Sequence, residues 1–151
     1  MSSLFGSDAM GGVVNVQTRE FAQLNFEGTF QTLDNASALT IGGAPRDDTS
    51  LGLTVRTADE ASASDGTSLN TGYRQGAAVL QHERGWQTLK LRVTGLLSRG
   101  EDIGKSSREY PESTSLYPHE RHGILKVELE HPDQWLLRLY EHRQDWQTTT
   151  E

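Results

Sequence analysis

Alternation of apolar and polar side chains is the feature that most constrains how this chain can fold. The clearest case is LKLRVTGLLS at residues 89–98, where leucines and a valine alternate with lysine, arginine, threonine and serine. Successive side chains of a strand point to opposite faces, whereas apolar residues of a helix recur every three or four positions. The period of two therefore predicts a β-strand with one apolar and one polar face.

Six further segments with strand-like patterns predict an all-β chain. With the first segment they make seven antiparallel strands, which we expect to be connected as an up-and-down meander. The predicted strands cover residues 22–31, 36–43, 49–57, 73–83, 89–98, 121–131 and 134–146.

The predicted connections differ in length. ERGW at residues 83–86 and HPDQ at 131–134 are predicted as tight turns, because Gly85 tolerates a positive φ and Pro132 presets a turn dihedral. Long polar links follow at 57–72, whose stretch 58–70 resembles a linker, and at 99–120. Outer-membrane barrels alternate short periplasmic turns with long outer loops in this way.

Composition favours a sheet with a single apolar face. Hydrophobic residues make up 34% of the chain, below the roughly 45–50% typical of globular domains. A soluble β-sandwich needs apolar side chains on two inner faces, whereas the wall of a membrane barrel has one apolar face and one wet face. The low apolar content thus favours a barrel wall over a sandwich.

Charge and residue usage exclude several classes of function. The net charge of −7 disfavours a nucleic-acid partner, which would need a basic surface. The absence of cysteine excludes a disulfide framework and a thiolate metal site. The chain has no apolar run near the roughly 18 residues of a transmembrane helix, and its first residues lack the features of a signal peptide.

Seven strands alone do not close a barrel. Open edges within a bilayer would leave backbone groups without hydrogen bonds, and plugged outer-membrane transporters have about 22 strands. We therefore expect the chain to be part of a larger barrel. A complete eight-stranded barrel is the structural alternative, against which the polar tail at 147–151 counts.

Three blocks resemble one protein family. Residues 4–18, LFGSDAMGGVVNVQT, resemble the end of the plug domain of TonB-dependent outer-membrane receptors. Residues 100–106 with 117–122, and residues 139–146, are similar to an outer loop and the following strands in iron-related members. The resemblance implies that residues 1–20 are the end of the plug domain and that residues 21–151 are the first strands of an incomplete barrel.

The function implied by this resemblance is active uptake of a ferric siderophore, haem or a similar nutrient across the outer membrane. The implied partners are the TonB energy-coupling complex, whose contact box is absent from this chain, the iron chelate or haem, and membrane lipid. No cofactor and no enzymatic activity are implied, and no catalytic motif is present. The glycine-rich turn is interpreted as a structural plug turn formed by Gly6, Ser7, Asp8, Gly11 and Gly12.

Aromatic and imidazole side chains supply the candidate ligand contacts. Tyr110, Tyr117 and His119 are predicted to lie in the long loop, with His122 just beyond it. Rings of this kind can stack on or coordinate haem or a catecholate ligand. The spacing H-x-x-H beside Glu120 also allows a metal site, but no third ligand is indicated, so solvated loop residues are the preferred interpretation.

The tryptophans are predicted to mark the two rims of the barrel. Trp86 and Trp135 adjoin the short turns and are interpreted as a periplasmic aromatic girdle, with Trp146 at the opposite rim. Two alternatives remain for the whole chain. One is a soluble all-β binding module that recognises its ligand through residues 99–120, and the other is a small autonomous outer-membrane barrel.

Overall fold

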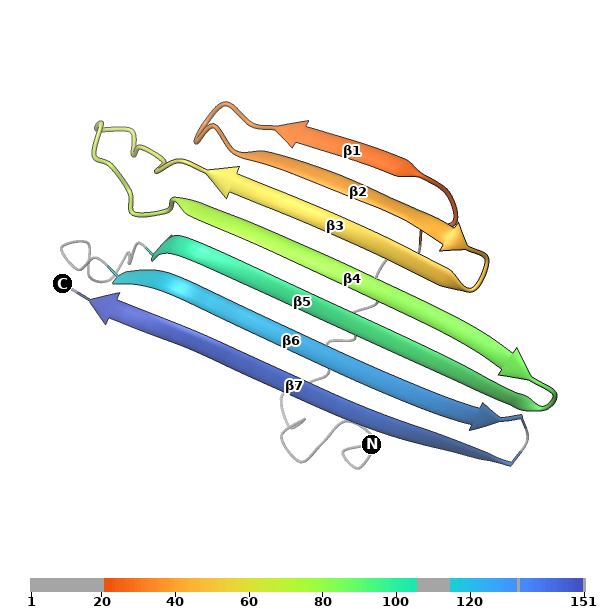
Figure 1. Ribbon diagram of the computed structural model, residues 1–151. Coiled ribbons are helices and arrows are strands. Elements are labelled where there is room, and N and C mark those ends of the chain that lie inside the picture. The colour runs from red at the N-terminus through yellow and green to blue at the C-terminus, as the bar shows by residue number, and fades with distance from the viewer. Residues whose placement is uncertain (1–20, 106–114, 133, 151) are drawn as a thin grey trace.

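One antiparallel sheet of seven strands makes up the fold (Figure 1). The computed structural model describes residues 21–105, 115–132 and 134–150. Strand order in the sheet follows chain order, so the predicted all-β meander is confirmed. The strands are β1 (Asn25–Phe30), β2 (Ser37–Arg46), β3 (Thr49–Ala58), β4 (Tyr73–Trp86), β5 (Leu89–Lys105), β6 (Ser115–His131) and β7 (Trp135–Thr150).

The sheet is open. β1 pairs only with β2, and β7 pairs only with β6, among the residues that the structure describes. The two edge strands lie at opposite sides of the sheet in Figure 1 and do not meet. The described sheet is therefore not closed into a barrel.

The turn predicted at residues 83–86 is wrong. β4 continues through these residues, with Gly85 paired to Lys90 and Trp86 paired to Leu89. The chain turns at residues 87–88 instead, where Gln87 has a φ of 50°. Gly85 lies in extended backbone and does not adopt a positive φ. The backbone pairing of β4 with β5 therefore continues up to the turn.

The long loop predicted at residues 99–120 is also wrong in extent. β5 continues to Lys105 and β6 begins at Ser115, with Arg99 paired to Arg121 and Ile103 paired to Tyr117. Backbone groups make the hydrogen bonds between strands, so polar side chains do not end a strand that has a paired neighbour.

The first strand is shorter than predicted and begins at Asn25. The plug turn at residues 6–12 and Tyr110 lie outside the described residues.

Short and long connections lie at opposite ends of the sheet (Figure 1). The short-turn end carries residues 47–48, 87–88 and 132–134. The long-loop end carries residues 31–36 and 59–72 and the link between β5 and β6. This alternation holds along all seven strands, as the sequence predicts for the last four.

The segment 59–72 folds as a small hairpin and is not an irregular linker. Ser62 and Ser68 form a β-bridge, and the Ala63 N–H donates to the Thr67 carbonyl at 2.8 Å. Hydrogen bonds from the Thr67 N–H and hydroxyl lower the pKa of Asp65 below its ordinary value. The Asn70 amide donates to the Ser115 carbonyl at 2.7 Å and so ties the hairpin to β6.

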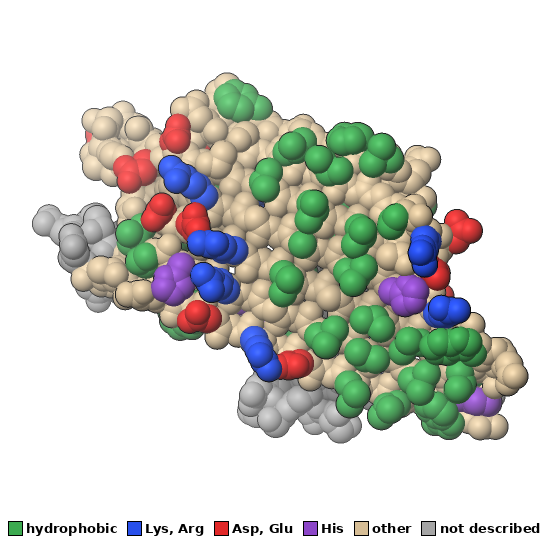
Figure 2. All heavy atoms as spheres, viewed as in Figure 1, with side chains coloured by type: hydrophobic (Ala, Val, Ile, Leu, Met, Phe, Trp, Pro, Cys, Tyr) green, Lys and Arg blue, Asp and Glu red, His purple; other side chains and the backbone are tan. Residues whose placement is uncertain are grey.

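The sheet has one apolar face. Direct cross-strand partners share a face, and the pairing register gathers large apolar residues of all seven strands on one side. Figure 2 shows these side chains as a continuous field on the face toward the viewer. The apolar face comprises Phe26, Leu39, Ile41, Leu51, Leu53, Val55, Leu80, Leu89, Leu91, Val93, Leu97, Leu125, Val127, Leu129, Leu137 and Leu139.

Most of the apolar face is exposed. Leu53, Leu97 and Leu139 have 60%, 66% and 60% of their surface accessible. Phe21 and Ala58 are the only buried apolar residues in the described part of the chain. The described sheet therefore has no second layer of secondary structure over this face, and its large apolar area is left without protein contacts.

Phe21 lies on the opposite, polar face. Its N–H donates to the Ser50 hydroxyl at 2.9 Å, and its ring lies against the backbone of Gly42 and Gly52. A Cβ atom at Gly52 would lie 2.6 Å from that ring and 2.9 Å from Val79. Glycine is required here because the ring approaches the strand backbone closely.

Candidate functional site

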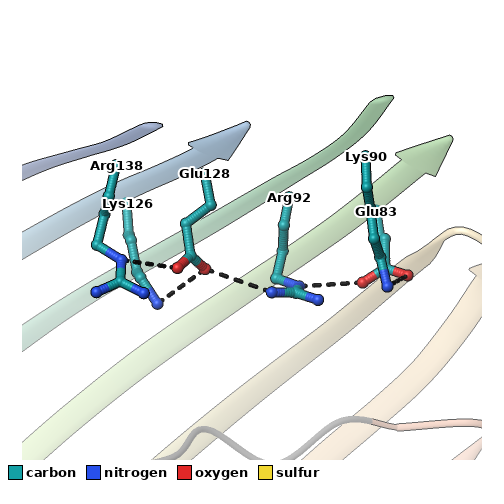
Figure 3. Close-up of polar contacts among 6 residues, drawn as sticks. All are labelled: Glu83, Lys90, Arg92, Lys126, Glu128 and Arg138. Carbon is teal, nitrogen blue, oxygen red and sulfur yellow. Dashed lines mark hydrogen bonds and ion pairs between the residues drawn. The ribbon is translucent and has the colours of Figure 1, made fainter. Parts of the chain in front are cut away.

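The polar face carries two groups of side chains, one near each end of the sheet. The group nearer the short-turn end is a row of charged residues across β4 to β7, here called the ion row (Figure 3). Its side chains come from neighbouring strands and point to the same side of the sheet. The ion row consists of Glu83, Lys90, Arg92, Lys126, Glu128 and Arg138.

Glu83 accepts two cations from β5. Lys90 Nζ lies 2.6 Å from Glu83 Oε1, and Arg92 Nε donates to Oε2 at 3.0 Å. All three side chains are about half exposed. Exposed pairs of this kind contribute little to stability individually, but Arg92 also connects this carboxylate to the next one in the row.

Glu128 is the buried centre of the ion row, with 5% of its surface accessible. Arg138 Nε donates to its Oε1 at 2.8 Å, Lys126 Nζ lies 2.9 Å from Oε2, and Arg92 Nη1 lies 3.6 Å from Oε2. A carboxylate with so little water contact needs charged hydrogen-bond partners. The three cations, on β5, β6 and β7, supply them and join these strands across the face.

The second group lines a groove toward the long-loop end, here called the polar groove. Its volume is about 470 Å³. The small side chain of Ala77 leaves space between larger side chains on β3 and β6. The polar side chains along the groove are Thr54, Arg56, Gln75, Ser98, Glu120 and His122.

The two sides of the polar groove differ in charge. On β3, the Arg56 guanidinium lies 5.6 Å from the centre of the Tyr73 ring. On β6, His122 Nε2 lies 2.5 Å from Glu120 Oε1, and the His122 ring stacks on His142 at 5.9 Å. A cation on one side and an imidazole–carboxylate pair on the other, with hydroxyl and amide groups between, can hydrogen-bond a polar ligand that bears an acidic group.

The structure separates the predicted contact residues. Tyr117 and His119 lie in β6 and not in a loop, so that part of the prediction is wrong. His119 pairs with Glu101, whereas His122 pairs with Ser98 on the other face. Of the predicted contacts that lie in the described part of the chain, His122 is the one that lines the polar groove.

Tyr117 has its own partners near the long-loop end. Its hydroxyl accepts a hydrogen bond from Lys105 Nζ at 2.9 Å, and its ring centre lies 5.6 Å from that of Trp146. Trp146 thus lies toward the long-loop end of the sheet, while Trp86 and Trp135 adjoin the short turns. These contacts fix Tyr117 against the neighbouring strands.

The H-x-x-H spacing does not bring two imidazoles together. Residues three apart in a strand point to opposite faces, so His119 and His122 cannot bind one metal ion. Within the ranges that the structure describes, no group of three or more histidine, aspartate or glutamate side chains is arranged to hold a metal.

Sequence reasoning missed Arg56, Gln75 and Ser98 as groove residues. The alternation places Arg56 and Ser98 on the polar phases of their strands. It does not give the register, which decides which residues of different strands lie side by side. A small residue in the polar phase of a strand, such as Ala77, is the sequence signal from which a groove could have been predicted.

Comparison with protein families, curated proteins and solved structures finds no match to this chain. No helix in the described ranges is long and apolar enough to cross a membrane.

Proposed function

We propose that this chain is part of the wall of a TonB-dependent outer-membrane receptor that takes up a ferric siderophore, haem or a similar nutrient. In this proposal the apolar face contacts membrane lipid and the polar face lines the lumen. The chain binds and admits a ligand and performs no catalysis. Its further partner is the TonB energy-coupling complex, which acts on the plug of the complete receptor.

The course of the apolar band across the strands carries the proposal. Direct cross-strand partners lead across the sheet from Ile41 through Leu53, Ala78, Leu97 and Gly123 to Arg143. Ile41 lies in the apolar stretch of β2, whereas Arg143 lies six residues beyond Leu137, the middle of the apolar stretch of β7. The apolar band is therefore oblique to the strands.

The obliquity can be expressed as an angle. Six residues of strand span about 20 Å, and the five spacings from β2 to β7 span about 24 Å. If the band lies in the plane of a membrane, the strands are tilted from the membrane normal by about 40°. Strands of membrane barrels are tilted by about 35–45°. A bilayer explains this angle directly. The hydrocarbon layer lies at the same depth for every strand, so the apolar segments of tilted strands form a band that is oblique to the strands.

The length of the band supports the same proposal. In β5 the apolar side chains extend from Leu89 to Leu97, after which Arg99 and Glu101 follow on the same face. Nine residues match the roughly 9–11 that a tilted strand needs to cross the hydrocarbon core. The remaining part of β5 would extend beyond the membrane, where charged side chains are solvated.

The position of Phe21 supports the assignment of the faces. The segment that resembles a plug domain precedes Phe21, and Phe21 lies on the polar face near the short-turn end. A plug fills the lumen of the receptors that this chain resembles, so a chain leaving the plug should reach the wall from the inside. The short-turn end is then periplasmic, and the polar groove opens toward the outer end, where a ligand arrives.

The test uses the gene product that contains this chain, in isolated outer membranes. The chain has no cysteine. With any cysteine elsewhere in the gene product replaced by serine, Leu53→Cys and Thr54→Cys each introduce one labelling site, on opposite faces of β3. We expect a fluorophore at position 53 to be quenched by brominated lipid and one at position 54 to be quenched by aqueous iodide. Equal quenching of both by iodide, with the protein in the soluble fraction, would contradict the proposal and favour a soluble all-β binding module.

Uptake is measured in intact cells that produce the same gene product. We expect radiolabelled haem or ferric siderophore to accumulate only while the proton-motive force is maintained. Because Arg56 and His122 face each other across the polar groove, Arg56→Ala and His122→Ala should each weaken ligand binding about tenfold. Tyr140→Phe, elsewhere on the polar face, is the control. Unchanged binding in both groove variants would remove the polar groove from the proposal.

A further inference from the structure

The apolar face ends in a set of arginines toward the long-loop end. Arg99 and Arg121 are direct cross-strand partners on β5 and β6, and Arg143 follows on β7 opposite Gly123. All three are exposed. Figure 2 shows basic and acidic side chains together beside the hydrophobic side chains at this end. We call these three residues the arginine rim.

The arginine rim contains a repulsive contact. Like charges directly opposite each other on two strands destabilise a sheet. Arg99 is paired with Glu101, and Arg143 Nε lies 2.6 Å from Glu141 Oε1. Arg121 makes no ion pair with any residue that the structure describes, although Asp145 is its cross-strand partner. An anion between Arg99 and Arg121 would relieve this repulsion.

A wide open groove adjoins the arginine rim on the same face. Its volume is about 960 Å³. Leu53, Val55, Ala78 and Leu97 line its apolar part, and the three arginines lie at its other end together with Asp145. Gly76 and Gly123 have no side chain and leave the floor of the groove open. The groove is therefore apolar along one part and charged at one end, where Arg121 is the arginine that no described carboxylate pairs.

We propose that this groove binds a phosphorylated, acylated lipid of the membrane. The phosphate lies between Arg99 and Arg121, and an acyl chain lies along Leu53, Ala78 and Leu97. Guanidinium groups bind phosphate through paired N–H donors and keep spare donors when one carboxylate is already bound. Basic side chains at the membrane boundary recognise anionic lipid headgroups in this way. The inference rests on the proposed function, since it takes the apolar face to contact lipid.

Native mass spectrometry of the gene product that contains this chain, in neutral detergent micelles, tests the inference. Phosphatidylglycerol or phosphatidylcholine is added to the micelles, or inorganic phosphate is added to the buffer. We expect retained phosphatidylglycerol and little retained phosphatidylcholine. The double variant Arg99→Gln/Arg121→Gln should weaken phosphatidylglycerol binding about thirtyfold, about fivefold for each arginine removed. Arg46→Gln/Arg84→Gln, two exposed arginines near the short-turn end, should leave binding unchanged.

A second variant separates the two parts of the ligand. A Cβ atom at Gly123 would lie 3.5 Å from Leu97 Cδ2, an ordinary contact, so Gly123→Leu fills the groove without forcing the strands apart. It should remove phosphatidylglycerol adducts. Retention of inorganic phosphate at the same level as phosphatidylglycerol in the unaltered protein would show a site for a free anion and overturn the lipid assignment.

The outcomes distinguish this inference from the proposed function. If the label at position 53 is quenched by brominated lipid but phosphatidylglycerol is bound no better than phosphatidylcholine, only the lipid site is wrong. If the label is not quenched by lipid, the membrane wall is wrong and the lipid site is wrong with it.

Discussion

Gly42 and Gly52 are direct partners on β2 and β3, and together they form the surface that receives the Phe21 ring. No other aromatic ring among the described residues is buried. At the scale of single residues, these two glycines therefore determine where the chain reaches the sheet.

A methyl group at Gly52 should displace Phe21. We expect Gly52→Ala to lower the free energy of unfolding by about 1–3 kcal/mol, since the Phe21 ring and Val79 would both have to move. The measurement is urea unfolding in detergent micelles, followed by far-ultraviolet circular dichroism. Gly28→Ala in β1 is the control, because a Cβ atom there meets nothing within 4 Å. Equal effects of the two variants would show that the Phe21 contact is unimportant.

Removal of the Glu128 carboxylate should leave its cations without a partner. We expect Glu128→Gln to lower the free energy of unfolding by about 1–3 kcal/mol, because Arg138 and Lys126 lose a charged acceptor. Glu141→Gln serves as the control, since its carboxylate is half exposed and its ion pair should contribute less than about 1 kcal/mol. The same urea titration compares both variants, and a Glu128→Gln protein as stable as the control would contradict the prediction.

At the scale of the strand, β5 presents the sharpest contrast between faces. Val93 lies on the apolar face and Thr94 on the polar face. In lipid vesicles we expect Val93→Lys to cost about 2–4 kcal/mol, as for a charge at the bilayer midplane, and Thr94→Lys to cost much less. Urea unfolding of the vesicle-bound protein measures the difference. Equal costs would indicate that β5 is not lipid-facing on this side.

The turn between β4 and β5 has an unfavourable residue for its conformation. Gln87 has a φ of 50°, in the left-handed region that glycine adopts at low cost. We expect Gln87→Gly to raise the free energy of unfolding by about 1 kcal/mol. Gln134→Gly, in the short connection between β6 and β7, gains no such relief, and thermal unfolding of both variants provides the comparison. A lower melting temperature for Gln87→Gly would contradict the assigned turn.

The number and faces of the strands could be predicted from alternation, but several strand ends could not. Alternation between large apolar and polar residues stops at Ser98, while backbone hydrogen bonding continues to Lys105. The polar groove was only partly predictable for a related reason. The imidazole of His122 identified it as a candidate ligand contact. Arg56 and Gln75, which also line the groove, lie on other strands, and the sequence of a strand does not give its register with its neighbours.

At the scale of the molecule, both edges and one face of the sheet lack partners in the described residues. Unpaired edges and large apolar areas promote association in water. We expect sedimentation velocity without detergent to show oligomers that grow with concentration. Replacing Leu137 and Leu139 on β7 with lysine should reduce this association, whereas Arg138→Lys should not. A single monomeric species of the unaltered chain would contradict this expectation.

The connections at the two ends of the sheet differ in how much change of length they can tolerate during evolution. At residues 47–48 and 87–88 the link is two residues long, so a single inserted residue would shift the pairing and exchange the faces of a strand. At residues 59–72 the link is a separate hairpin, and added residues would lengthen it without disturbing the ladder. The connections at the long-loop end can therefore change in length during evolution, whereas those at the short-turn end stay nearly constant.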